Sequence, residues 1–173
     1  GSLTVKNLEI ATSVSCTENN VGGLIGYLES THIKVEASTL LDANMVVEGS
    51  ESVGGLFGRA NSSTLEGPSE NDVVYNGLIP KMSSFKNQYN GHVRGRSHIG
   101  GILGTLSGGN PTLKCFSADC TVSPSGSSSA ESVGGIVGYV CGSNNSITEC
   151  VFKGILNSNG GQYAGGIIGL VDY

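Results

Sequence analysis

The sequence predicts an all-β fold, namely a parallel β-helix (β-solenoid) of about five coils with roughly 32 residues per repeat. Two observations carry this prediction. A hydrophobic Gly-Gly-x-x-Gly strand recurs five times, and strands with apolar and polar residues in alternation lie between the copies. Short strands that repeat at this period, with Gly, Asn and Ser turns between them, are typical of a solenoid coil. No stretch shows the 3.6-residue apolar period of a helix.

The glycine pairs are the most regular feature of the repeat. Their first members are spaced by 32, 46, 34 and 31 residues. Since glycine permits positive φ and close backbone approach, we expect the pairs to turn the same corner in every coil. The pairs are Gly22 and Gly23, Gly54 and Gly55, Gly100 and Gly101, Gly134 and Gly135, and Gly165 and Gly166.

Two consecutive apolar positions follow each glycine pair. The first is occupied by Leu24, Leu56, Ile102, Ile136 and Ile167, and the second by Ile25, Phe57, Leu103, Val137 and Ile168. In a regular strand adjacent residues face opposite sides, so one of these two ladders would point outward. Either a kink at the glycines brings both ladders inside, or loops or a partner cover the outer one.

A second strand element, with strict alternation, is expected in every interval between glycine strands. In the third interval it reads Phe116-x-Ala118-x-Cys120-x-Val122, and in the fourth Cys150-x-Phe152-x-Gly154-x-Leu156. Such alternation indicates a strand that is buried on one face.

The chain is expected to form a single domain over residues 1–173. The spacing of 46 residues indicates a loop insertion of about 13 residues near residues 60–81, and the Ser/Gly-rich stretch predicts a flexible loop near 123–131. Neither end carries the polar cap that solenoids need for solubility. We therefore expect a segment of a longer array, or ends covered by neighbouring solenoid segments.

Composition excludes several classes of protein. The formal net charge of −5 gives no basic footprint for nucleic acid. No run of 18 apolar residues is present to span a membrane in this segment. The five cysteines cannot all pair with one another, and their spacings do not match a zinc site. They are expected to be small buried hydrophobic residues or to form one or two disulfides.

No constellation of catalytic, cofactor-binding or metal-binding residues is found, which predicts a protein that is not an enzyme. The glycine strands are not a dinucleotide fingerprint, because no helix follows them. Four aspartates are scattered over different coils and form no acidic stripe of the kind used by polysaccharide-cleaving β-helices, namely Asp42, Asp72, Asp119 and Asp172.

One candidate ligand patch comprises His92, Arg94, Arg96 and His98, which occupy every second position along the chain. In an extended strand they lie on one outward face, where they form either an anion or acidic-glycan patch or an ordinary solvated face. The histidines are too far apart, about 20 Å, to share a metal ion.

The insertion supplies a second candidate site, a binding loop with Glu66, Glu70, Asp72 and Tyr75, for which an ordinary surface loop is the alternative. Asn61 and Asn144 begin candidate N-glycosylation motifs.

The five glycine strands resemble the GLUG-motif repeats, which are named for a Gly-Leu-x-Gly core. Such repeats occur in large bacterial surface proteins, in filamentous-haemagglutinin-like adhesins, in the non-catalytic parts of immunoglobulin A peptidases and in surface proteins of some protists. The resemblance implies a parallel β-helix-like fold and extracellular or cell-surface display. It implies no catalytic residues, because the peptidase zinc motif is missing.

Together these observations predict a non-enzymatic repeat module that acts as an adhesin or stalk and binds a host glycan or protein receptor. The alternatives are a filament or scaffold component that assembles through the solenoid ends, and a polysaccharide-processing β-helix.

Overall fold

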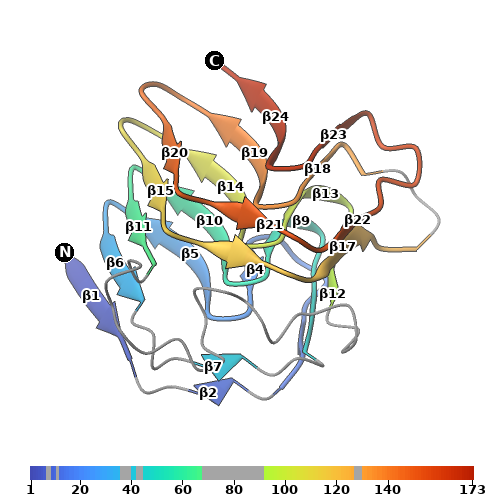
Figure 1. Cartoon of the computed structure of the whole chain (residues 1–173), viewed down its shortest axis with the longest axis horizontal. Helices are drawn as coiled ribbons and strands as arrows, with labels where there is room; N and C mark the ends of the chain where they lie inside the picture. The colour runs from blue at the N-terminus through green and yellow to red at the C-terminus, as the bar shows by residue number, and fades with distance from the viewer. Residues whose placement is uncertain (7–8, 11, 36–39, 42–44, 68–91, 127–129) are drawn as a thin grey trace.

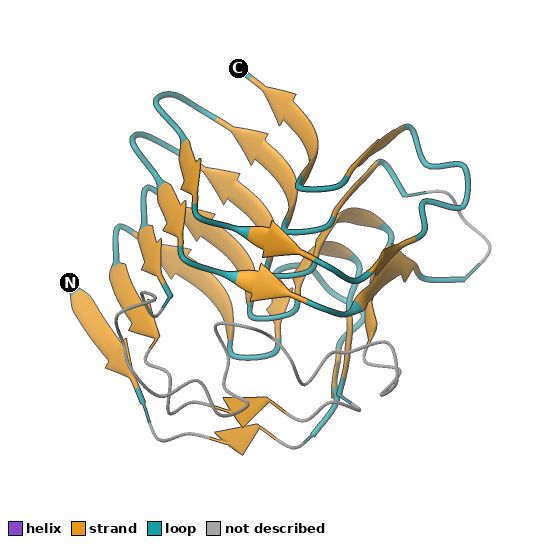
Figure 2. Ribbon diagram, viewed as in Figure 1, coloured by secondary structure: helices purple, strands orange, loops and turns teal. Residues whose placement is uncertain are grey.

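The chain folds into stacked β-coils. A computed structural model describes residues 1–6, 9–10, 12–35, 40–41, 45–67, 92–126 and 130–173. Figures 1 and 2 show the described strands winding into coils that stack on one another, with the two termini at opposite ends of the stack. The described residues contain strands and turns but no helix, and therefore no long apolar helix that could cross a membrane.

Four parallel sheets of five strands each form the sides of the solenoid. Sheet I holds β1 (Ser2–Val5), β6 (His32–Val35), β11 (Thr64–Glu66), β15 (Thr112–Lys114) and β20 (Ser146–Thr148). Sheet II holds β3 (Val14–Ser15), β8 (Val46–Glu48), β12 (His92–Gly95), β17 (Thr121–Pro124) and β22 (Ile155–Leu156). Sheet III holds β4 (Val21–Gly22), β9 (Glu51–Gly54), β13 (Ser97–Gly100), β18 (Ser132–Gly134) and β23 (Tyr163–Gly165). Sheet IV holds β5 (Ile25–Glu29), β10 (Phe57–Asn61), β14 (Leu103–Ser107), β19 (Val137–Cys141) and β24 (Ile168–Asp172). Between sheets I and II, β2 (Glu9–Ile10) pairs with β7 (Leu40–Leu41), and β16 (Ser117–Ala118) with β21 (Val151–Phe152).

The strand register confirms the repeat predicted from the glycines. Phe57 pairs with Ile25 on one side and with Leu103 on the other, and Val137 pairs with Leu103 and Ile168. These partners are separated by the same numbers of residues as the glycine pairs. About four turns, of some 33 residues each, relate the first strand of a sheet to its last.

The core is a set of stacked aliphatic ladders. Ile33, Leu65 and Leu113 of sheet I have no solvent exposure, and the same holds for Val47, Val93 and Val122 of sheet II. Phe57 of sheet IV meets Phe116 edge to face, with ring centroids 6.0 Å apart. The predicted alternation in the third interval is confirmed, because Phe116, Ala118, Cys120 and Val122 are all buried.

A kink after the glycine pairs of the three middle coils places both apolar ladders inside. Leu56 and Phe57 are consecutive, yet both amides donate to the same carbonyl oxygen, that of Ile102 in the next coil. The same pair of hydrogen bonds recurs in the next coil, where the amides of Ile102 and Leu103 both donate to the carbonyl oxygen of Ile136. Two amides that point the same way break the alternation of the strand, so Leu56 and Phe57 are both fully buried. The kink is therefore the correct one of the two predicted explanations.

The first glycine of each pair is required for close approach rather than for positive φ. A Cβ on Gly54 would collide with the carbonyl oxygen of Phe57, three residues later. A Cβ on Gly134 would collide in the same way with the carbonyl oxygen of Val137. The left-handed conformation instead occurs two residues before the first glycine, at Asn20, Ser52 and His98. The expectation that the glycine pairs supply positive φ is thus wrong, while the close approach is confirmed.

The boundaries of two predicted loops change. Residues 57–61 and 64–66 are the regular strands β10 and β11. The extra residues of the 46-residue spacing therefore come after Glu66, and not from residue 60 onward. The predicted loop near 123–131 begins only after Pro124, because Thr121–Pro124 is β17.

Candidate functional site

The predicted patch of His92, Arg94, Arg96 and His98 is divided by a turn between two sheets. His92 and Arg94 face outward on β12, in alternation with the buried residues Val93 and Gly95. The strand ends there, and Arg96 is exposed in the turn. His98 lies on β13 of the next sheet with a φ of 52°. The chain turns before the expected parity can continue, so the four side chains do not share one face.

His92 and Arg94 form the sheet II side of this corner. Burial, followed by the charge of Arg94, lowers the pKa of His92. In the register of the sheet, Arg94 lies next to Glu48 in the preceding coil and Ser123 in the following one. This side of the corner therefore combines a cation with a neighbouring carboxylate.

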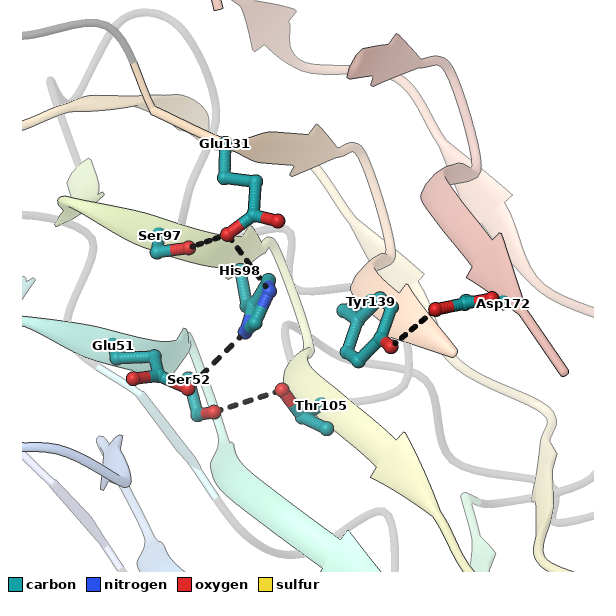
Figure 3. Close-up of polar contacts among 8 residues, drawn as sticks. All are labelled: Glu51, Ser52, Ser97, His98, Thr105, Glu131, Tyr139 and Asp172. Atoms are coloured by element: carbon teal, nitrogen blue, oxygen red, sulfur yellow. Dashed lines mark hydrogen bonds and ion pairs between the residues drawn. The ribbon is translucent and has the colours of Figure 1, made fainter. Parts of the chain in front are cut away.

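His98 lies between two carboxylates on the sheet III side (Figure 3). Its Nδ1 is 3.4 Å from Oε1 of Glu51, and its Nε2 is 3.6 Å from Oε2 of Glu131. Nδ1 is buried and makes no hydrogen bond among the described residues. The hydroxyl of Ser97 donates to Oε2 of Glu131 at 3.1 Å. Ser97 and His98 together hold this carboxylate in place.

The other face of this cluster is closed by Tyr139 of the next coil. The imidazole of His98 stacks on the Tyr139 ring, with centroids 4.4 Å apart and planes inclined by 15°. Burial raises the pKa of Tyr139 to about 12, and the nearby Cys141 and Asp172 act in the same direction. The Tyr139 hydroxyl keeps its proton at neutral pH and donates to Asp172 at 3.3 Å.

An open hollow of about 360 Å³ lies beside this cluster and is lined by Arg96, Ser97, Ala130, Glu131 and Gln162. Its residues come from three successive coils. Ile99 pairs with Val133, which pairs with Ala164. Counting back two residues from each places Ser97, Glu131 and Gln162 in one column of the solenoid. The hollow therefore crosses neighbouring strands at the corner between sheets II and III.

The charges at this corner nearly balance. Two guanidinium groups, those of Arg94 and Arg96, accompany the carboxylates of Glu48, Glu51 and Glu131. Within the described part of the chain, Arg96 makes no ion pair. The corner can thus offer the guanidinium of Arg96, an oriented carboxylate and an amide to a ligand.

Of the residues in the predicted binding loop, only Glu66 is among those that the structure describes. Glu66 belongs to β11, where its carboxylate contacts Nζ of Lys114 at 3.0 Å and Nε2 of His32 at 3.4 Å. Glu70, Asp72 and Tyr75 lie outside the described residues.

The two candidate glycosylation sites differ in accessibility. Asn61 ends β10, where its amide donates to Glu29 at 2.8 Å and its carbonyl accepts from Ser107 at 3.2 Å. Asn144 is exposed, and its amide donates to Asn110 at 3.0 Å. Asn144 is therefore the better presented acceptor.

All five cysteines are free thiols, so the alternative of one or two disulfides is not observed. The alternative of buried thiols holds for Cys120, whereas Cys16 is exposed and the other three are half-buried. The thiol of Cys115 donates to Glu149 at 2.8 Å, and burial raises its pKa to about 11. The described residues contain no group of three or more His, Cys, Asp or Glu side chains that could hold a metal ion.

Four residues of this corner were not predicted from the sequence, namely Glu51, Glu131, Tyr139 and Gln162. A signal for two of them was present, because Glu-Ser-Val-Gly-Gly occurs both at Glu51 and at Glu131. Alignment of these copies would have placed both acids beside the glycine strands and in line with Ser97.

Comparison of the chain with protein-family models, curated proteins and solved structures finds no match. The resemblance to the GLUG-motif repeats accordingly stays a prediction that rests on the five glycine strands alone.

Proposed function

We propose that this chain is a non-enzymatic repeat module of an extracellular or cell-surface protein, which acts as an adhesin or stalk and binds a host glycan or protein. The observation that carries the proposal is the open polar hollow at the corner between sheets II and III. Its side chains come from three coils and include the guanidinium of Arg96, which makes no ion pair with any described residue.

A rigid scaffold supports these side chains. Ile99 and Val133, which directly follow the residues of the corner, have no solvent exposure. Binding groups that are held by a packed core lose little conformational freedom when a ligand binds. Polar groups on the outside of a rigid solenoid are therefore well suited to recognition of a surface ligand.

The proposal can be tested with the purified full chain on a panel of animal cell surfaces. Saturable binding is expected, and removal of the receptor by protease or periodate treatment identifies it as a protein or a glycan. If the chain binds to none of the surfaces, the adhesin role is contradicted. Turnover of an acidic polysaccharide would contradict the assignment as a non-enzyme.

A second candidate function, assembly through the solenoid ends, is favoured by the apolar surface of the last coil. Of the eight large hydrophobic residues that are exposed in the described structure, six lie in residues 151–173. Ile167 is 38% exposed, whereas Ile136, one coil earlier in the same ladder, is fully buried. Concentration-dependent end-to-end association, measured by analytical ultracentrifugation, would support this role. A monomer at all concentrations would exclude self-assembly of the isolated chain.

A further inference from the structure

We infer that the hollow of Arg96, Ser97, Glu131 and Gln162 binds a neutral, hydroxyl-rich ligand, namely one sugar unit of an uncharged glycan. The inference rests on the proposed function and names the ligand class of the same site. The observation behind it is the pairing of donors and acceptors around one open space.

The hydrogen-bonding groups of the hollow complement adjacent hydroxyls. A guanidinium only donates, a carboxylate only accepts, and an amide does both. A sugar hydroxyl donates one hydrogen bond and accepts others. Neighbouring hydroxyls can therefore accept from Arg96, donate to Glu131 and exchange both kinds of bond with Gln162.

The charge of the hollow favours a neutral ligand over an anion. The hollow contains one cation, Arg96, and one anion, Glu131, and Glu51 lies near it on the far side of His98. An acidic ligand would gain the contact with Arg96 but would meet the repulsion of Glu131. An uncharged ligand can use both groups without this repulsion.

Glu131 is oriented before any ligand arrives. Its Oε2 is held by Ser97 and His98, while the side chain as a whole is 52% exposed. No interaction of Oε1 with another described group is found, so this oxygen can accept a bond from a ligand. Such preorganisation lowers the entropy cost of binding.

The shape of the hollow fits one unit of a longer chain. Its volume of about 360 Å³ lies at the lower end of small-molecule sites. Its polar column repeats at the spacing of parallel strands, about 4.8 Å. Since the hollow is open rather than enclosed, the rest of a polymer can continue along the corner.

The test uses the full chain on an array of neutral gluco-, galacto- and manno-oligosaccharides beside uronate-bearing and sulfated ones. Binding to at least one neutral series is expected. Gln162→Ala and Arg96→Ala should each weaken it by about tenfold or more, because each leaves ligand hydroxyls unpaired. Arg94→Ala is the matched control, since Arg94 does not line the hollow, and it should leave binding unchanged. Circular dichroism verifies that each variant is folded.

Three results would overturn the inference and differ in what they say of the proposed function. Binding confined to acidic oligosaccharides, lost equally in Arg94→Ala and Arg96→Ala, would replace the neutral ligand by an anion. Binding to cells without binding to any oligosaccharide would favour a protein receptor. In both cases the surface role stands. Absence of binding to cells and to the array would refute both proposals.

Discussion

The ring of His98 stacks on the ring of Tyr139. One coil earlier, the equivalent pair is Ser52 and Thr105, whose hydroxyls are hydrogen-bonded to each other. The register aligns Ser97 with Glu51, and therefore His98 with Ser52, and it aligns Tyr139 with Thr105. The ring centroids of His98 and Tyr139 are 4.4 Å apart, and the two hydroxyls of the earlier pair are 2.8 Å apart. One connection between sheets III and IV is thus made by two different chemistries in successive coils.

The stacked pair predicts a difference between two substitutions of Tyr139. Tyr139→Ala removes the ring beneath His98 and should lower the free energy of unfolding by about 2 kcal/mol. Tyr139→Phe keeps the ring and loses only a partly exposed bond to Asp172, so a loss of about 0.5 kcal/mol is expected. Urea denaturation measures both. Equal losses would show that the hydroxyl, not the stack, stabilises the corner.

The hydroxyl pair predicts opposite results for two serines at the same repeat position. Ser52→Ala leaves the buried hydroxyl of Thr105 without its partner and should cost about 1–2 kcal/mol. Ser132 is fully buried, and its hydroxyl has no hydrogen bond among the described groups. In the coil after Ser132, the position equivalent to Thr105 is occupied by Leu170, which has no hydroxyl. Ser132→Ala should therefore be neutral or stabilising. Thermal unfolding of the two variants decides, and a clear loss in Ser132→Ala would contradict the assignment.

The ion pairs of Glu66 predict a stability that depends on pH. The hydrogen bond from Lys114, followed by charge and by the contact with His32, lowers the pKa of Glu66, although burial opposes this. A lowered pKa in the folded state adds stability above the ordinary value of 4.5, which is lost as the pH falls through the lowered value. Glu66→Gln should cost roughly 0.5–1 kcal/mol at pH 7. This difference should vanish in strong acid.

A double-mutant cycle of Glu66→Gln with Lys114→Gln measures the interaction energy between the two side chains. A coupling that persists unchanged at low pH or in high salt would contradict the ionic explanation.

The fold could be predicted from the sequence because a solenoid repeats its constraints in each coil. The spacing of the glycines is the spacing of the strand partners, and alternation at Phe116, Ala118 and Cys120 correctly identifies the buried side. The kink could not be predicted in the same way. Leu56 and Phe57 are simply two apolar neighbours in the sequence, and only the shared acceptor, the carbonyl of Ile102, shows why both are buried.

The site was less accessible to prediction because it depends on where strands end. Arg94 and Arg96 have the same parity, but a turn after Gly95 separates them. The position of His98 follows from a positive φ, which the residue type does not indicate. Alignment of the repeats could have revealed Glu51 and Glu131, whereas the hollow requires the three-dimensional corner.

The free thiols predict a stability that is independent of reductant. Cys16 is exposed, whereas Cys120 is fully buried with a pKa raised to about 12 and Cys115 has a pKa of about 11. Because the thiolate is the reactive form, Cys16 should be alkylated first by iodoacetamide at pH 8, and Cys120 last. Cys16→Ser should remove the fast phase of alkylation.

Addition of dithiothreitol should leave the melting temperature unchanged. A melting temperature that falls with dithiothreitol would reveal a stabilising disulfide and contradict the free thiols.

The glycine corners predict that the effect of one substitution depends on the coil in which it is made. Gly135 and Gly166 are the second glycines of successive pairs. A Cβ on Gly135 would collide with the carbonyl of Gly166 and the ring of Phe152, whereas a Cβ on Gly166 meets nothing within 4 Å. Gly135→Ala should therefore cost on the order of 3 kcal/mol or more, with a shift of the whole unfolding transition.

Gly166→Ala is the matched control, because it makes the same change at the same point of the motif without a collision. It should cost at most about 1 kcal/mol. Chemical denaturation followed by circular dichroism compares the two variants. If both are equally destabilised, the motif needs glycine for its backbone conformation. If only Gly135→Ala unfolds readily, the glycines are required because adjacent coils approach too closely for any side chain, and the repeat is then a consequence of stacking itself.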